Sequence, residues 1–124
     1  MNAYIAVAIG GAIGAMSRYF LTQTVATSSS GNFPWGTFLV NILGSLLIGV
    51  LFILFTERSS LEVYRPLLTV GFLGSLTTFS TFSLDALLLF QQGHYNTALF
   101  YVLSSVVICF FAAWFGMLMA RAVF

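Results

Sequence analysis

Four long apolar stretches make up most of the 124-residue chain, and they limit its possible folds more than any other feature. They lie near residues 3–24, 35–56, 66–89 and 97–120. Each is long enough to cross a bilayer, since a spanning helix needs about 20 mostly apolar residues. Only 6% of the residues are charged, whereas a soluble domain has about 25%. We therefore expect one domain, residues 1–124, that is an all-α integral membrane protein with four transmembrane helices.

The few charges are all close to the predicted helix ends. Arg58, Arg65 and Arg121 fall on the side of the membrane that would hold both termini, and Arg18 falls toward the other side. The positive-inside rule then favours cytoplasmic termini, but four arginines give a weak signal, and insertion in both orientations is compatible with it. A net charge of +1 without a basic patch argues against nucleic-acid binding.

The third apolar stretch contains an unusual segment at residues 71–83, GFLGSLTTFSTFS. It holds two glycines, three threonines, three serines and two phenylalanines spaced three apart, Phe79 and Phe82. Such residues weaken a regular helix, and free backbone groups at membrane depth persist only where protein or a water-filled path satisfies them. We predict that the third helix is broken here, at a transport site, and Gly74 would tolerate the backbone angles that a break requires.

Further polar candidates lie on the other stretches. Gly10 and Gly14 have the spacing that lets two membrane helices approach closely. Arg18 follows on the same face, where it either extends to the interface or serves a pore vestibule or anchors a neighbouring backbone. Asn41 lies about two turns into its stretch, in a stripe with Thr37 and Ser45, and is either an interhelical hydrogen-bonding group or a donor lining a pore.

The hydroxyl and aromatic groups leave similar alternatives open. Phe79 and Phe82 either pack against neighbours or turn their positive ring edges toward an anion. Ser80 and Thr81 either bond back to the preceding turn or line a path. Tyr101 and Ser105 begin a stripe that continues with Cys109 and Ala113 at intervals of four residues.

Several chemistries lack the residues that they need. Asp85 is near the far end of its stretch, and no acidic residue, lysine or histidine lies near the centre of any stretch. Proton-coupled carriers and intramembrane enzymes need such groups. His94 and Cys109 are single residues of their types, which argues against a multi-ligand metal site. Hydroxyls, one amide and aromatic edges remain, and these can replace water around a small ion.

The segment 71–83, the segment 36–41 (GTFLVN) with Gly44, and the glycines before Arg18 resemble the Fluc (CrcB) family of fluoride channels. The resemblance covers the whole chain. It implies a passive, fluoride-selective channel, not an enzyme, that exports toxic fluoride across the bacterial inner membrane. It also implies an antiparallel, dual-topology homodimer with two pores.

The family pattern assigns roles to individual positions. Asn41 matches the pore asparagine, and Phe79 and Phe82 match the phenylalanines whose ring edges face fluoride. Ser80 and Thr81 lie in the same turn, and Tyr101 and Ser105 match a polar track on the fourth helix. Arg18 matches an arginine of the first helix.

The resemblance further implies a central structural Na⁺ ion held by the backbone carbonyls of Gly74 and Thr77. A buried water molecule is the alternative occupant of that position. The chain departs from the family where Gly74-Ser75 replaces a pair of glycines and where Cys109 and Ala113 replace hydroxyl residues. Two other functions stay open: a small four-helix drug/proton antiporter, although the first stretch lacks the acidic residue that antiporters use, and a membrane assembly protein that transports nothing.

Overall fold

The computed structural model describes residues 2–124, which are helical or irregular, with no β-strand among them. The elements in chain order are α1 (Ala3–Ser28), α2 (Trp35–Glu57), η1 (Ser59–Tyr64), η2 (Pro66–Leu73), α3 (Gly74–Leu76), α4 (Phe79–Gln91) and α5 (Tyr95–Val123). Four helical stretches within these residues are long and apolar enough to cross a membrane, the third being Pro66–Gln91. The prediction of an all-α chain with four spanning helices is confirmed.

Helix α1 continues to Ser28, past the end predicted near Thr24. Hydroxyl groups add hydrogen bonds to the carbonyls of its last turns. Thr27 and Ser28 both donate to the Thr24 carbonyl at 2.9 Å, and the Ser29 hydroxyl donates to the Val25 carbonyl at 2.8 Å. The loop to α2 is therefore shorter than the sequence suggests.

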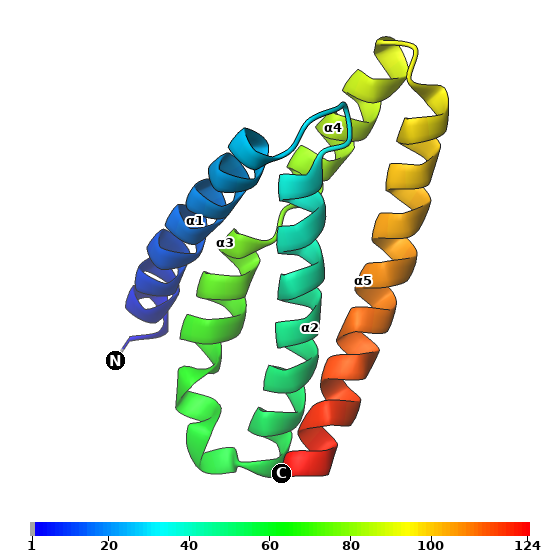
Figure 1. Cartoon of the computed structure of the whole chain (residues 1–124). Coiled ribbons are helices and arrows are strands. Elements are labelled where there is room, and N and C mark those ends of the chain that lie inside the picture. Colours follow the sequence, from blue (N-terminus) through cyan, green and yellow to red (C-terminus); the bar gives the residue numbers. More distant parts are fainter. Residues whose placement is uncertain (1) are drawn as a thin grey trace.

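The helices form two close pairs (Figure 1). Helix α2 packs along α5, while α1 packs against η2 and α3. Glycines set the spacing of the first pair: a Cβ atom added at Gly49 would overlap the Ala113 carbonyl, and one added at Gly116 would overlap the Leu46 carbonyl. Backbones can approach this closely only where one residue lacks a side chain.

The predicted glycine pair of α1 forms a contact of the same kind. Gly10 and Gly14 are buried, and added Cβ atoms would overlap the Leu67 and Phe72 carbonyls of η2. On the opposite side of the contact, a Cβ atom at Gly71 would lie 2.7 Å from the Val7 carbonyl oxygen. The pair therefore joins α1 to the first half of the third span.

The third span has three segments of different backbone geometry. Pro66 begins η2, a position that suits a residue without an N–H, and η2 is a π-helix. The short helix α3 ends at Leu76, and Thr77 (φ −83°, ψ 156°) and Thr78 (φ −152°, ψ 119°) are extended before α4 begins at Phe79.

The backbone angles of the break do not fall on Gly74, although glycine would tolerate them. It is helical (φ −62°, ψ −27°), and the two threonines carry the extended angles instead. Extended dihedrals suit a β-branched residue, so glycine is not needed for the turn itself.

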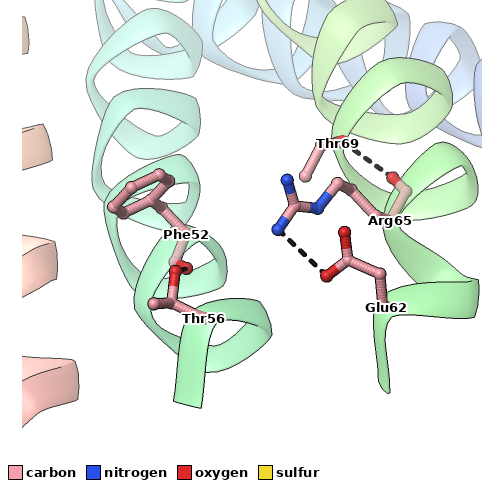
Figure 2. Close-up of polar contacts among 5 residues, drawn as sticks. All are labelled: Phe52, Thr56, Glu62, Arg65 and Thr69. Atoms are coloured by element: carbon pink, nitrogen blue, oxygen red, sulfur yellow. Dashed lines mark hydrogen bonds and ion pairs between the residues drawn. The ribbon is translucent and has the colours of Figure 1, made fainter. Parts of the chain in front are cut away.

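Arg58 and Arg65 lie near the end of the bundle where α2 meets η1. Arg58 stacks on Phe124, the last residue, with 5.6 Å from its Cζ atom to the ring centroid. Arg65 pairs with Glu62 at 3.1 Å, and its carbonyl accepts the Thr69 hydroxyl at 2.7 Å (Figure 2). Both termini lie toward this end of the bundle (Figure 1), which agrees with an even number of spans.

Candidate functional site

A cavity of about 420 Å³ lies between α2, the third span and α5. Its lining consists of residues from all three regions: Asn41, Gly44, Ser45, Ile48, Thr69, Leu73, Gly74, Thr77, Thr78, Phe79, Phe82, Ser105, Val106 and Cys109. None of these residues is Asp, Glu, Lys, Arg or His. The polar groups that face the cavity are therefore hydroxyls, one amide, one thiol and backbone.

Six of the residues predicted for the pore or the ion site line this cavity: Asn41, Gly74, Thr77, Phe79, Phe82 and Ser105. Ser80, Thr81 and Tyr101 lie immediately behind the lining, where they contact Thr78 or Phe82. Arg18 lies apart from them, half-buried on α1. Helix α1 adds no residue to the lining within the described part of the chain.

Asn41 holds the backbone of Thr78 through both ends of its side-chain amide. Its Nδ2 donates to the Thr78 carbonyl at 3.1 Å, and its Oδ1 accepts the Thr78 N–H at 2.8 Å. In a continuous α-helix this N–H would donate to the carbonyl of Gly74. The amide thus makes the interhelical hydrogen bonds that were one of the two roles considered for Asn41 from the sequence. The second hydrogen on its Nδ2 atom is not used in these two bonds.

Thr78 also caps helix α4. Its Oγ1 accepts the Thr81 N–H at 3.1 Å and lies 3.2 Å from the hydroxyl oxygens of both Ser80 and Thr81. An N-cap hydroxyl of this kind satisfies one of the free N–H groups at a helix start. Ser80 and Thr81 therefore face Thr78, whereas only Ser83 bonds back to its own helix, at the Phe79 carbonyl.

The helical ladder is interrupted at these residues. The Thr78 N–H goes to Asn41, so the Gly74 carbonyl loses the donor that a regular helix would provide. Thr77 is extended, so its carbonyl lies outside the ladder, and the Thr81 N–H in the first turn of α4 goes to the Thr78 hydroxyl. The Thr77 N–H still donates to the Leu73 carbonyl at 3.0 Å. Two carbonyls close together in the chain are left available for another partner.

The two phenylalanines differ sharply in exposure. Phe82 is 8% exposed and packs against Tyr101, with 5.1 Å between the ring centroids, whereas Phe79 is 78% exposed. The rings of Phe79 and Phe82 lie 5.5 Å apart. Tyr101 is fully buried, and its hydroxyl donates to the Asp85 carboxylate at 3.3 Å. Asp85 is half-buried within α4, closer to the site than its position near the end of the third stretch suggested.

Ser105 carries the one hydroxyl in the cavity that is both buried and without a partner. Its residue is 5% exposed, and its Oγ atom has no hydrogen-bond partner among the described residues. Its neighbour Ser104 donates to carbonyls of its own helix instead. A buried hydroxyl normally has a partner, so Ser105 is suited to bind a group that enters the cavity.

Comparison with known proteins identifies the family. The sequence model described as "CrcB-like protein, Camphor Resistance (CrcB)" matches residues 5–117. The chain belongs to the CrcB family. The resemblance seen in the sequence is thereby confirmed.

Among its CrcB relatives, the chain is 50% identical over 118 residues to the fluoride-specific ion channel FluC of Magnetococcus marinus, an alignment covering 94% of this chain and 96% of the relative. It is 46% identical to the FluC proteins of Hahella chejuensis and Pseudoalteromonas translucida, over 94% and 90% of this chain and 93% of each relative. As a CrcB-family chain with four such helices, it is a multi-pass membrane protein.

The set of site residues predicted for this CrcB-family chain omitted several residues that the structure places in the cavity. Thr78 is the most important, because it is both the residue that Asn41 holds and the cap of α4. The sequence feature that could have indicated Thr78 is its position in the hydroxyl-rich segment 71–83. Ser45 had a signal in the stripe of Thr37 and Asn41, and Gly44 had one in the family motif, whereas Thr69 had none that separated it from packing residues.

Proposed function

We propose that this chain is a passive ion channel that is selective for fluoride and exports it across the bacterial inner membrane. The observation that carries the proposal is identity of up to 50%, over nearly the whole length, to proteins named fluoride-specific ion channels. A cavity lined by uncharged donors supports it, because such groups can bind an anion without taking up or releasing a proton.

The cavity offers fluoride replacements for water. Moving a bare ion into a low-dielectric interior costs tens of kcal/mol unless donors replace its hydration shell. The second N–H of Asn41 and the unpartnered hydroxyl of Ser105 are donors, and the ring edges of Phe79 and Phe82 carry partial positive charge. Ser80, Thr81 and Tyr101 extend the polar path behind them. A narrow path of this kind accepts fluoride and disfavours the larger chloride.

We further propose that the functional unit is an antiparallel homodimer with two pores, inserted in both orientations. Phe79 supports this, because a pore ring that is 78% exposed needs a second surface to confine the ion. Gly74 supports it as well: it is exposed, and an added Cβ atom would meet only the Thr69 carbonyl, at 3.7 Å. The break in the third helix would then face its counterpart in the partner.

The freed carbonyls fit a structural Na⁺ ion at the centre of this dimer. Carbonyl oxygens are suitable ligands for a hard cation, and broken membrane helices use such groups to hold Na⁺. The Gly74 carbonyl lacks the Thr78 N–H, and the Thr77 carbonyl belongs to the extended segment, so each copy would contribute two oxygens. The ion would supply positive charge that draws an anion into the neutral interior. Arg18 would serve a vestibule or anchor a neighbouring backbone.

Fluoride efflux from liposomes tests this function. Purified protein is reconstituted with internal potassium fluoride, and a fluoride electrode follows release after valinomycin supplies charge balance. We expect fast fluoride release, and retention of chloride in parallel liposomes. Efflux that requires a proton gradient would indicate an antiporter, and absence of flux from well-folded protein would indicate an assembly protein.

A further inference from the structure

Gly44 of α2 packs directly against the side chain of Thr77. A Cβ atom added at Gly44 would overlap the Thr77 Cγ2 methyl and would lie 3.6 Å from the Thr77 Cβ atom. Both residues line the cavity. Gly44 brings no polar group to an ion, so its contribution concerns the position of Thr77.

The orientation of the Thr77 side chain is fixed by a hydrogen bond. Its Oγ1 donates to the Leu73 carbonyl at 2.9 Å, which leaves the methyl group directed at Gly44. A threonine side chain has few allowed rotamers. The methyl can therefore move away from α2 only if this hydrogen bond breaks or the backbone of Thr77 shifts.

Helix α2 thus holds two consecutive residues of the break in two different ways. Asn41 binds the Thr78 backbone by hydrogen bonds. About one turn later, the missing side chain of Gly44 leaves room for the Thr77 methyl. We infer that Gly44 is a positioning residue for conduction: its missing side chain sets where Thr77 lies, and with it the direction of the Thr77 carbonyl. This inference rests on the proposed channel function.

The other tightly packed glycines have a different environment. Added Cβ atoms at Gly10, Gly14, Gly49, Gly71 and Gly116 would meet backbone atoms of a neighbouring helix. Mutation cannot remove a backbone atom, so a second substitution cannot relieve the clash that an alanine at one of these glycines would cause. At Gly44 the obstacle is one side-chain methyl, and replacing Thr77 by serine removes that methyl while keeping the hydroxyl.

The test is a double-mutant cycle in the full-length protein. Fluoride efflux is measured for wild type, Gly44→Ala, Thr77→Ser and the double variant, with elution volume and melting temperature recorded for each. Contacting residues couple strongly in such cycles, so we expect Gly44→Ala to slow efflux about tenfold and Thr77→Ser to recover most of that loss. Gly49→Ala, with and without Thr77→Ser, is the matched control, because Gly49 contacts α5 and not the break.

Each outcome bears on the inference. Recovery in the Gly44 pair together with none in the Gly49 pair supports positioning of Thr77. Normal efflux of Gly44→Ala, no recovery in the double variant, or equal recovery in both pairs overturns it. Absence of fluoride efflux from the wild type would instead contradict the proposed function, so the two failures are distinguishable.

Discussion

The side-chain amide of Asn41 and the backbone of Thr78 exchange two hydrogen bonds, of 3.1 Å and 2.8 Å, across 37 residues of sequence. The pair keeps the third span interrupted, because it takes the N–H that would otherwise continue the helix. It also fixes the amide beside the cavity. Asn41 therefore makes an interhelical contact and also lines the cavity, so the two roles that the sequence presented as alternatives are compatible.

Replacing Asn41 should abolish or strongly reduce fluoride efflux. Asn41→Ala removes both bonds to Thr78, and a buried polar group left without a partner costs about 1–3 kcal/mol. Asn41→Asp keeps an acceptor for the Thr78 N–H but places a negative charge at the cavity, so it should block an anion more completely. Liposome efflux and the elution volume of the purified protein measure these effects.

Thr56→Ala is the control for Asn41. Thr56 lies on the same helix, but its hydroxyl donates only to its own Phe52 carbonyl, at 2.8 Å (Figure 2). Efflux should stay near that of the wild type. Near-normal efflux from a well-folded Asn41→Ala protein would show that the amide is a packing group only.

Ser105→Ala should separate conduction from stability. The Ser105 hydroxyl is buried without a partner, so its removal should leave the melting temperature unchanged or higher. If that hydroxyl donates to fluoride in transit, efflux should fall about tenfold, since a hydrogen bond to a charged partner contributes about 1.5–3 kcal/mol. Ser104→Ala is the matched control, because its hydroxyl bonds within α5. Equal efflux from both variants would remove Ser105 from the path.

The two phenylalanines should differ in their effect on folding but not on conduction. Phe79 is exposed in the single chain, so Phe79→Ile should hardly alter chain packing, whereas Phe82→Ile disturbs contacts with Tyr101 and should lower the melting temperature. Both substitutions remove a positive ring edge and should reduce efflux, and the double variant should abolish it. Thermal unfolding in detergent and liposome efflux are the measurements. Normal efflux from the double variant would show that both rings serve packing and not conduction.

The number and position of the helices could be predicted from the sequence because hydropathy over about 20 residues is a local property. The polar candidates could be found for a similar reason, since an amide or a hydroxyl cluster is conspicuous among apolar residues. The contact between Asn41 and Thr78 could not, because it depends on how far α2 extends along the third span. That register follows from close approaches at glycines such as Gly44 and Gly49, whose partners lie far away in sequence.

The location of the extended residues could not be predicted for a related reason. Glycine at a predicted break suggests unusual dihedrals, but Thr77 and Thr78 are simply extended, and Gly74 is helical. The π-helical geometry of η2 had no signal in the sequence either. Both features depend on contacts between helices, and residue type alone does not specify those contacts.

Insertion in both orientations should be visible by labelling. With Cys109→Ala as background, a cysteine added after Phe124 should react with an impermeant reagent from both sides of the inner membrane. The physical reason is the small number of arginines available to bias insertion. A control with an added Lys/Arg cluster in the loop near Arg58 should react from one side only. Labelling of the original protein from one side alone would reject dual topology.

Sodium should be needed for the assembled channel, and this prediction depends on the two freed carbonyls. If the Gly74 and Thr77 carbonyls of both copies hold Na⁺, replacing sodium by a large organic cation should lower the melting temperature of the dimer and slow efflux. Stabilisation by a bound ion grows with its concentration, by about 2.7 kcal/mol at a hundred times its dissociation constant. Potassium at equal ionic strength is the control for general salt effects.

A structure of the dimer would decide what occupies the position between the breaks. Sodium should show short contacts of about 2.3–2.5 Å to the carbonyl oxygens, close to the range for calcium–oxygen contacts. A water molecule would show contacts of about 2.8 Å and would donate to the carbonyls. Thr78→Val gives a complementary test, because it removes the hydroxyl that caps α4 next to the Thr77 carbonyl. We expect that variant to require more sodium for the same melting temperature, and an unchanged requirement would argue against the Thr77 carbonyl as a ligand.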